Sequence, residues 1–445
     1  MTKVATAEAW QLRASGGFDP DWYAAAYPDV ADSELGPAEH FLWLGARLGR
    51  SPLPPACPGV AASRPRRTAA TSAGLLDALF IDGTNGGSSA PYRVQRIADG
   101  LAEQGWLVRS ASSAQLPALI AEDLAPRVTV IHRAAYRDLF PAFVHRMRAR
   151  GSIIVYDIDD LVFDEALIPF VDSFRHMNEG QQRHFRTHLR ENRDFVLAAD
   201  VCTASTTTIT AEIERLGKPA FRVRNSLAPR NVDMFQASLR RPARPRPFTV
   251  GYYSGTRTHQ ADLAQFAPAL AQFLRDHDDV YFRLAGAFDL SAYPELAQWQ
   301  DGEGRLPRVT RVGLMPHDTM LRDQLSCDLI VAPLELGNPF CEAKSELKFF
   351  EAALASCPVI ASPTVPFVEA TQGGRLAMLA SSTAEWLAAL RGAYRDYGSA
   401  HRQAEQAFQH VRVNYSQAAA AAEAAAAYQG FHDWREKRAS LRAAG

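Results

Sequence analysis

Two lysines, a serine and a glutamate near residue 350 have the types and the spacing to bind a sugar diphosphate. A helix is predicted over 345–356 in "KSELKFFEAALASCPVIAS". Lys344, Lys348 and Glu351 stand at i, i+4 and i+7, so we expect one helix face to present them. Ser345 would fall in the first turn, where free backbone N–H groups favour an anion. A nucleotide sugar suits this set, although an amphipathic surface helix with a Lys348–Glu351 pair is the alternative.

Aspartates at the end of an apolar run form a second candidate site, in "GSIIVYDIDDLVFD". Asp157, Asp159 and Asp160 suggest a divalent cation, acid/base carboxylates or a solvated strand end. A magnesium ion would need the diphosphate beside it, which the lysines hold elsewhere, so we expect no metal site. We predict that Asp157 orients an acceptor hydroxyl or takes its proton. Asp159 and Asp160 would contact acceptor hydroxyls or cap the next turn.

A glycine-rich turn, "FIDGTNGGSSAPYRV", follows the first apolar strand. Gly86 and Gly87 lack side chains, so a phosphate or a sugar can approach the backbone there. Arg93, one helical turn further on, is either an acceptor-binding group or a surface arginine. His132 ends the strand "RVTVIHR" and is a catalytic candidate, with a structural role as the alternative.

Two further loops follow strands in the second half of the chain. In "YYSGTRTH", Gly255 lets a ligand approach the backbone and Arg257 can pair with a diphosphate. In "VAPLELGNPF", Asn338 is either a donor-binding residue or part of a turn.

The composition is that of a soluble globular protein with 47% hydrophobic and 22% charged residues. The net charge of −1 gives no reason to expect a nucleic-acid partner. The five cysteines include no C-x-x-C pair, which argues against a disulfide scaffold or a cysteine zinc site. No signal peptide or membrane span is expected, so we predict a cytoplasmic protein, at most at the inner face of a membrane.

Short apolar strands alternate with helices twice along the 445 residues. Such alternation predicts two parallel sheets, each covered by helices on both faces, with a cleft between their carboxyl ends. The fold class is thus α/β, with two doubly wound Rossmann-like domains and a small N-terminal helical module. The predicted parts are a helical module (1–51), a linker (52–74), an acceptor domain (75–237), a linker (238–247), a donor domain (248–400) and C-terminal helices (401–445).

The segment "KSELKFFEAALASCPVIASPTVPFVEA" resembles the donor-site signature of GT-B glycosyltransferases, specifically the retaining group called family 4. "YYSGTRTHQADL", "LIVAPLELGNPF" and "YDIDDLVFD" resemble stretches of bacterial polysaccharide-building members. Glu351 matches the second glutamate of the family's E-x7-E motif, which contacts donor hydroxyls. The first glutamate is replaced by Ala343. Either Glu342 takes over from a shifted loop, or backbone N–H groups near Lys344 and Ser345 do.

The resemblance implies a glycosyltransferase that acts with retention, without a metal ion or other cofactor. Such an enzyme transfers a sugar from a nucleotide sugar to a glycan, lipid-linked or protein acceptor. The resemblance also implies that Arg257 pairs with the donor diphosphate and that Gly86 and Gly87 face that group. Two alternatives stay open, namely a sugar-nucleotide epimerase and a non-catalytic sugar-binding or partner-binding module.

The two ends of the chain carry further expectations. "FDPDWYAAAYPDV" resembles segments attached to some bacterial glycosyltransferases, and its aromatic residues would pack two short helices or bind a partner or a membrane surface. The alanine-rich tail is predicted to form a helix that returns to the first domain.

Overall fold

The computed structural model describes residues 18–31, 35–41, 50, 75–171, 174–175, 177–236, 247–254, 260–286, 288–300 and 307–443. By their internal contacts these residues fall into two units. The β1–β6 unit lies within residues 49–169, 176–226 and 416–445. The β7–β12 unit lies within residues 1–48, 170–175 and 227–415. The predicted linkers 52–74 and 238–247 lie outside the described residues, apart from Pro247.

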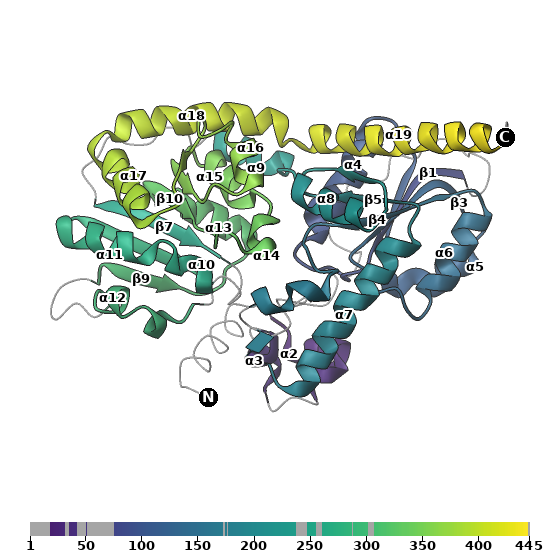
Figure 1. The fold of residues 1–445 in the computed structure, drawn as a ribbon, viewed down its shortest axis with the longest axis horizontal. Helices are drawn as coiled ribbons and strands as arrows, with labels where there is room; N and C mark the ends of the chain where they lie inside the picture. Colours follow the sequence, from purple (N-terminus) through teal and green to yellow (C-terminus); the bar gives the residue numbers. More distant parts are fainter. Residues whose placement is uncertain are drawn as a thin grey trace. The chain divides into compact units, whose positions relative to one another are not determined.

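The β1–β6 unit is built on a parallel sheet with the strand order β2-β1-β3-β4-β5-β6 (Figure 1). The strands β4 and β5 are buried along their whole length, as expected for strands covered by helices on both faces of the sheet. The strands are β1 Leu75–Asp82, β2 Val108–Ser112, β3 Ala125–His132, β4 Ile153–Ile158, β5 Val201–Ala204 and β6 Ala220–Arg222.

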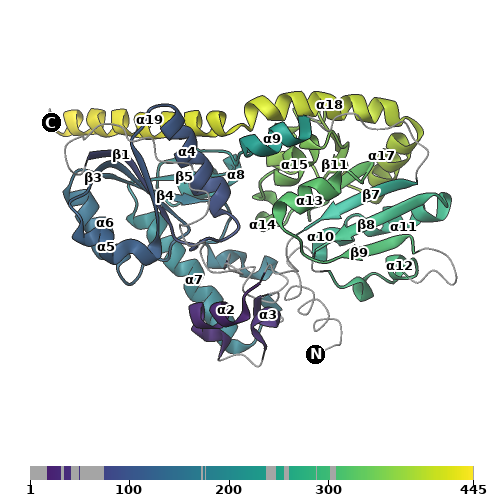
Figure 2. The ribbon, with the colours of Figure 1, turned by 180° about the vertical axis from the view of Figure 1, so that it is seen from behind.

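Helices flank this sheet, and the alanine-rich tail is one of them. They are the π-helical turn η3 Pro91–Gln95, α4 Arg96–Glu103, η4 Ser113–Gln115, α5 Leu116–Ala121, α6 Phe140–Ala149, η5 Glu165–Phe170, α7 Glu179–Ala198, α8 Thr207–Arg215 and α19 Gln417–Ala443. In both views α19 lies along α4 (Figures 1 and 2). Ala420, Ala421 and Ala424 of α19 are buried against Ile97 and Leu101 of α4. The small alanine side chains let the two helices approach closely.

The β7–β12 unit contains a second parallel sheet, in the order β12-β11-β10-β7-β8-β9. Two six-stranded parallel sheets with flanking helices confirm the predicted fold class. The strands are β7 Phe248–Tyr253, β8 Val280–Ala285, β9 Val309–Val312, β10 Leu329–Ala332, β11 Val359–Ala361 and β12 Met378–Leu379.

Helices on this second sheet position the lysine and glutamate candidates. They are α9 Pro229–Gln236, α10 Gln260–Ala264, α11 Ala267–Asp276, η8 Leu290–Ala292, α12 Pro294–Ala297, α13 His317–Gln324, α14 Pro339–Glu342, α15 Leu347–Leu354, α16 Val365–Ala370, α17 Thr383–Arg395 and α18 Tyr397–Asn414. The short α15 is flanked by α18, α13 and α9, as Figure 2 shows. Its Phe349, Phe350 and Leu354 are fully buried, which fixes the direction in which its polar residues project.

The described part of the N-terminal module contains α2 Pro20–Ala26, η1 Pro28–Val30 and α3 Pro37–His40. Tyr23 is fully buried beside Phe41, with their ring centroids 5.5 Å apart, and its hydroxyl lies 3.2 Å from His40 Nδ1. These aromatic residues form a small core. Within the described parts of the chain, no helix combines the length and apolar character needed to cross a bilayer.

Candidate functional site

The lysine and glutamate candidates belong to an edge of the β7–β12 sheet that favours ligands. The chain runs from β7 through β8 to β9 on one side, and then returns to β10 on the other side of β7. In doubly wound sheets ligands bind outside the carboxyl ends of the strands at such a switch point. Tyr252 and Tyr253 end β7 at this edge, and the loop that begins at Pro333 leads from β10 to α14.

Helix α15 begins two residues later than the sequence predicts. Glu346 occupies the N-cap position and Leu347 is the first helical residue, so Lys344 and Ser345 lie in the preceding loop. The predictions that Lys344 shares a helix face with Lys348, and that Ser345 lies in the first turn, are therefore wrong. The reason is local, because residues 339–342 form a separate short helix, α14. The residues after Glu342 connect α14 to α15, so α15 starts later.

Lys348 is a half-buried cation beside the end of β7. Its Nζ lies 5.9 Å from the centroid of the Tyr252 ring. Burial lowers the pKa of Lys348 and the neighbouring charge of Lys344 adds to this, while the Asp262 and Glu351 carboxylates act in the opposite direction. An anion that binds beside Lys348 stabilises the charged form of its ammonium group. Its binding would therefore offset the effect of burial on the pKa.

Two hydroxyls at the end of β7 are candidates for ligand contacts. Tyr252 Oη and Ser254 Oγ are buried beside each other, and neither has a further hydrogen-bond partner within the part of the chain that the structure describes. The Tyr252 side chain is fully buried, and this burial raises the pKa of its hydroxyl well above the usual range. A buried polar group without a partner costs free energy, so such groups often mark a place for a ligand or a water molecule.

The segment between β10 and α15 is held by hydrogen bonds from its own Asn338 and from Asp262 of α10. Asp262 Oδ1 accepts from the backbone N–H of Glu335 at 3.1 Å, and Asn338 Oδ1 accepts from Phe340 N at 3.0 Å as the N-cap of α14. The Asn338 amide donates to Glu335 Oε2 at 2.9 Å and to a backbone carbonyl. Asn338 thus takes the turn role that the sequence left open, and its donor-binding role stays a prediction.

Glu342 is also part of this loop. Its Oε1 accepts from Gly337 N at 3.1 Å, and Gly337 has a φ of 77°, which only glycine adopts freely. Glu342 therefore closes the turn that precedes α14. This bond disfavours Glu342 as the substitute for the missing first glutamate at Ala343.

Glu351 projects from the second turn of α15 and is paired with a histidine. His317 Nε2 lies 2.7 Å from Glu351 Oε1. The Glu351 side chain is 8% exposed and that of His317 is 36% exposed. His317 lies 34 residues upstream, at the first position of α13, and no sequence motif singles it out. Only its place just after strand β9 could have pointed to it.

In the β1–β6 unit, strand register brings the other candidates together. Asp82 pairs with His132, His132 with Asp157 and Asp157 with Thr203, so the ends of four adjacent strands form one polar row. The switch point of this sheet lies between β1 and β3, within the same row. The sequence places His132 and Asp157 at strand ends but does not show that they are neighbours.

Asp157 is the centre of a buried network. Arg93 donates to its carboxylate through Nε at 3.0 Å and through a terminal nitrogen at 2.5 Å, and Thr203 Oγ1 donates at 2.6 Å. His132 Nδ1 lies 2.8 Å from Asp157 Oδ2, and His132 Nε2 lies 2.8 Å from Ser89 Oγ. A carboxylate only accepts, so a neutral His132 holds its proton on Nδ1 and accepts from the Ser89 hydroxyl at Nε2.

This burial changes what these residues can do. Arg93 and His132 have no exposed surface and Asp157 is 1% exposed. Burial alone would raise the pKa of Asp157, but Arg93 and the bond from His132 outweigh it, so this pKa lies far below its usual range. This burial disfavours direct contact of Arg93 and Asp157 with an acceptor, which stays a prediction, and the alternative that Arg93 is a surface arginine is wrong. A catalytic role of His132 stays a prediction, although it would have to act through Ser89.

Asp159 and Asp160 are engaged by an arginine that the sequence analysis did not single out. Arg133 forms ion pairs with both carboxylates, at 3.3 Å for Asp160 Oδ2. Arg133 has a φ of 45°, an unusual conformation for a residue with a side chain, and its N–H donates to the carbonyl of Asp157. Both aspartates keep some exposed surface, so their contact with acceptor hydroxyls stays a prediction.

Hydrogen bonds to Asp82 and Thr84 fix the conformation of the glycine-rich turn. Asp82 accepts from Gly86 N at 2.6 Å and from Thr84 N at 2.8 Å, and Thr84 Oγ1 accepts from Gly87 N at 2.9 Å. The N–H groups of Gly86 and Gly87 are therefore already bonded, which disfavours a phosphate cradle made from them. A close approach of a ligand to this side-chain-free surface stays a prediction.

Some predictions lie beyond what the structure tests. Gly255 and Arg257 lie outside the described residues. Within the described ranges there is no group of three or more histidine, cysteine, aspartate or glutamate side chains arranged to hold a metal ion. The predicted absence of a metal and of a cofactor stays a prediction.

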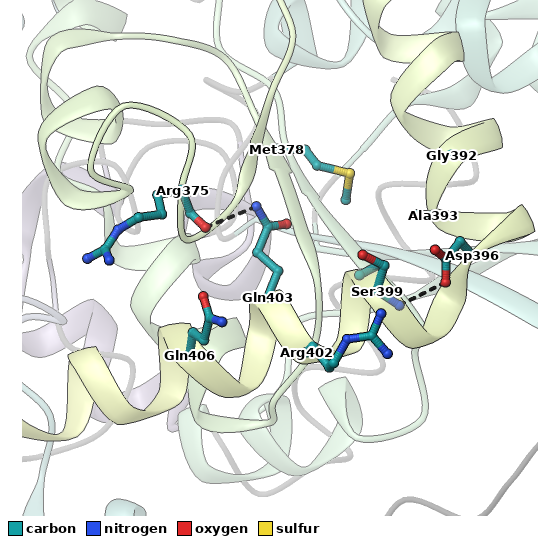
Figure 3. Close-up of a pocket in the computed structure, with 10 residues that line it drawn as sticks. Arg375, Met378, Gly392, Ala393, Asp396, Ser399, Arg402, Gln403 and Gln406 are labelled. Atoms are coloured by element: carbon teal, nitrogen blue, oxygen red, sulfur yellow. Dashed lines mark hydrogen bonds between the residues drawn. The ribbon is translucent and has the colours of Figure 1, made fainter.

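A separate groove of about 530 Å³ lies between β12, α17 and α18 (Figure 3). Gln403 crosses it and donates to the carbonyls of Gly374 and Arg375, and Asp396 accepts from Ser399 N at the start of α18. These hydrogen bonds connect α18 to the segment before β12 and cap the start of α18. The residues that line the groove include none of the predicted site residues.

Comparison with known proteins supports the fold. No protein-family model matches the chain, and no curated protein matches its sequence. The sucrose-phosphate synthase of Thermosynechococcus elongatus superposes with a TM-score of 0.52 and 14% identity, over 82% of this chain and 100% of that one. HepE of Anabaena, solved with UDP and glucose, gives a TM-score of 0.51 and 15% identity over 80% and 100%. These likenesses confirm the GT-B fold, whereas membership of family 4 stays a prediction.

Proposed function

We propose that the protein is a glycosyltransferase that moves a sugar from a nucleoside-diphosphate sugar to a glycan, lipid-linked or protein acceptor. The observation that carries this proposal is the set of groups near the switch point of the β7–β12 sheet. It combines the half-buried cation of Lys348, the paired carboxylate of Glu351 and the buried hydroxyls of Tyr252 and Ser254. The set offers both a cation and hydroxyl-binding groups, which a nucleotide sugar requires.

Each group has a defined task in this proposal. Lys348, aided by Lys344 from the preceding loop, stabilises the charge that develops on the departing diphosphate. The Glu351 carboxylate accepts hydroxyls of the ribose or of the sugar. With Ala343 in place of a glutamate and Glu342 bonded to Gly337, the Lys344 side chain faces the transferred sugar, because the backbone N–H of Lys344 already donates to the carbonyl of Cys341 at 3.1 Å.

One solved protein of the same fold supports the choice of donor, because HepE was solved with UDP and glucose. We therefore take UDP-sugars as the first donors to test. Retention of configuration follows only from the resemblance in sequence. A metal-free reaction is favoured because Arg93 and Arg133 already neutralise Asp157, Asp159 and Asp160, the carboxylates that could hold a cation.

The β1–β6 unit is the proposed acceptor side. Its polar row ends at Ser89, whose hydroxyl donates a hydrogen bond to Nε2 of a neutral His132, so the serine oxygen can accept a hydrogen bond from a ligand hydroxyl. Asp159 and Asp160 lie next to this row. A cytoplasmic location, with peripheral membrane or partner contact through the N-terminal module, belongs to the same proposal.

The test is the release of nucleoside diphosphate from UDP-, GDP-, ADP- and dTDP-sugars, with and without mixed glycan and lipid-linked acceptors. We expect release from one donor class, stimulated by an acceptor. The variants Lys348→Met and Glu351→Gln should lower this rate at least about 100-fold if each removes a charge-assisted contact in the transition state. Sugar interconversion without transfer would identify an epimerase instead. Binding without any turnover would identify a non-catalytic module.

A further inference from the structure

The donor and the acceptor of the hydrogen bond between His317 and Glu351 can be assigned from their chemistry. An ionised carboxylate has no hydrogen to donate, so at 2.7 Å the proton between the two groups belongs to His317 Nε2. His317 therefore donates and Glu351 accepts. The bond joins the start of α13 to the second turn of α15, two elements of the same unit.

The surroundings of Glu351 make this donor important. Phe350, Ala352 and Leu354 of the same helix are fully buried, and Glu351 itself is only 6% exposed. A carboxylate at such a place needs hydrogen-bond donors to remain charged. A single carboxylate can accept about four hydrogen bonds, so the bond from His317 does not prevent Glu351 from binding a diol.

We propose that His317 is a positioning residue that holds Glu351 ready for the vicinal diol of a ribose, and so sets a preference for ribonucleotides over 2′-deoxyribonucleotides. This inference rests on the proposed function, because it requires a nucleotide donor. His317 acts through Glu351, whose fixed oxygens accept the 2′-hydroxyl and the 3′-hydroxyl. Without His317 the carboxylate loses its fixed direction, and the contribution of the 2′-hydroxyl falls.

The test is calorimetric titration with UDP, GDP and ADP, followed by the 2′-deoxy form of the diphosphate that the wild type binds best. We expect the wild type to bind the ribonucleotide about 10- to 100-fold more tightly, as hydrogen bonds to a charged group suggest. His317→Ala should weaken ribonucleotide binding about 10-fold, leave the 2′-deoxy form nearly unchanged and so remove most of the preference. His317→Gln keeps an N–H donor and should restore much of it.

A matched control lies on the same helix. Arg322→Ala changes an exposed side chain of α13 and should leave both affinities at the wild-type values. Equal affinities of the wild type and of His317→Ala for both nucleotides would overturn the inference while leaving the proposed function intact. An equal loss of both nucleotides in His317→Ala, without rescue by His317→Gln, would also overturn it by revealing a merely structural role. No binding of any diphosphate by the wild type would reject the proposed function itself.

Discussion

Asp157 shows how a residue that looks reactive in the sequence becomes structural in the fold. Its place at the end of an apolar strand is evident from the chain. Its partners Arg93, His132 and Thr203 lie 64, 25 and 46 residues away in sequence, and only strand register and the helix after β1 bring them together. The sequence therefore predicts the position of Asp157 at a strand end but does not reveal its burial.

The buried pair of Asp157 and Arg93 should contribute strongly to the free energy of unfolding. Asp157→Asn leaves a fully buried guanidinium without its counter-charge, so we expect the free energy of unfolding to fall by about 3–5 kcal/mol. Urea denaturation followed by circular dichroism measures the change. The pair of Arg215 and Glu212, in which the arginine is exposed and the glutamate partly exposed, supplies the control, since Glu212→Gln should cost less than about 1 kcal/mol. Similar effects of the two substitutions would contradict the assignment.

The same pair makes a prediction about pH. The pKa of Asp157 is lower in the folded protein than in the unfolded chain, so its contribution is present above the unfolded value of about 3.9. It is lost as the pH falls further, towards the folded value. The stability gap between the wild type and Asp157→Asn should therefore be full at pH 7 and narrow below about pH 4. A gap that stays constant between pH 7 and pH 3 would show that the carboxylate charge is not responsible.

At the scale of elements, the sequence locates the strands well and misplaces one helix start. Alternating apolar runs suffice to find both six-stranded sheets, because buried parallel strands need little else. The start of α15 depends instead on the closure of α14 by Asn338 and on Glu346, whose carboxylate accepts from Tyr415 Oη at 2.8 Å. That hydrogen bond joins residues 69 positions apart, and no local pattern reveals it.

The contact of α4 with α19 predicts opposite effects on stability for two Gly→Ala substitutions. A Cβ atom at Gly100 would lie 2.8 Å from the Ala421 Cβ and 2.9 Å from the Gln417 carbonyl oxygen, whereas at Gly430 it would meet nothing within 4 Å. Gly100→Ala should therefore destabilise the protein by about 1–3 kcal/mol through crowding. Gly430→Ala should stabilise it by about 0.5–1 kcal/mol through helix propensity.

Thermal unfolding of both variants measures this difference. Two changes of the same sign would mean that α19 does not pack on α4 in solution as closely as the structure has it. The comparison is sharp because both substitutions replace a helical glycine with alanine and differ only in what surrounds the new methyl group.

At the scale of the whole molecule, the residue pattern was enough for the GT-B fold but not for the details of the candidate site. Lys348 and Glu351 are on α15 as the sequence predicts, whereas their companions Asp262, Tyr252 and His317 come from three other elements. Such companions are set by tertiary packing, and a single sequence carries no signal that links them. The proposed function therefore depends on whether the groups near the switch point bind a nucleotide.

The most direct test of this central claim is a calorimetric titration of the wild type and of Lys348→Met with UDP, GDP and ADP. Methionine keeps the apolar stem of the lysine and removes its charge, so an unchanged melting temperature serves as the control for folding. We predict that the wild type binds at least one diphosphate at a single site and that Lys348→Met binds it about 10- to 100-fold more weakly. Absence of binding to all three nucleotides, or equal binding by the two proteins, would contradict the account.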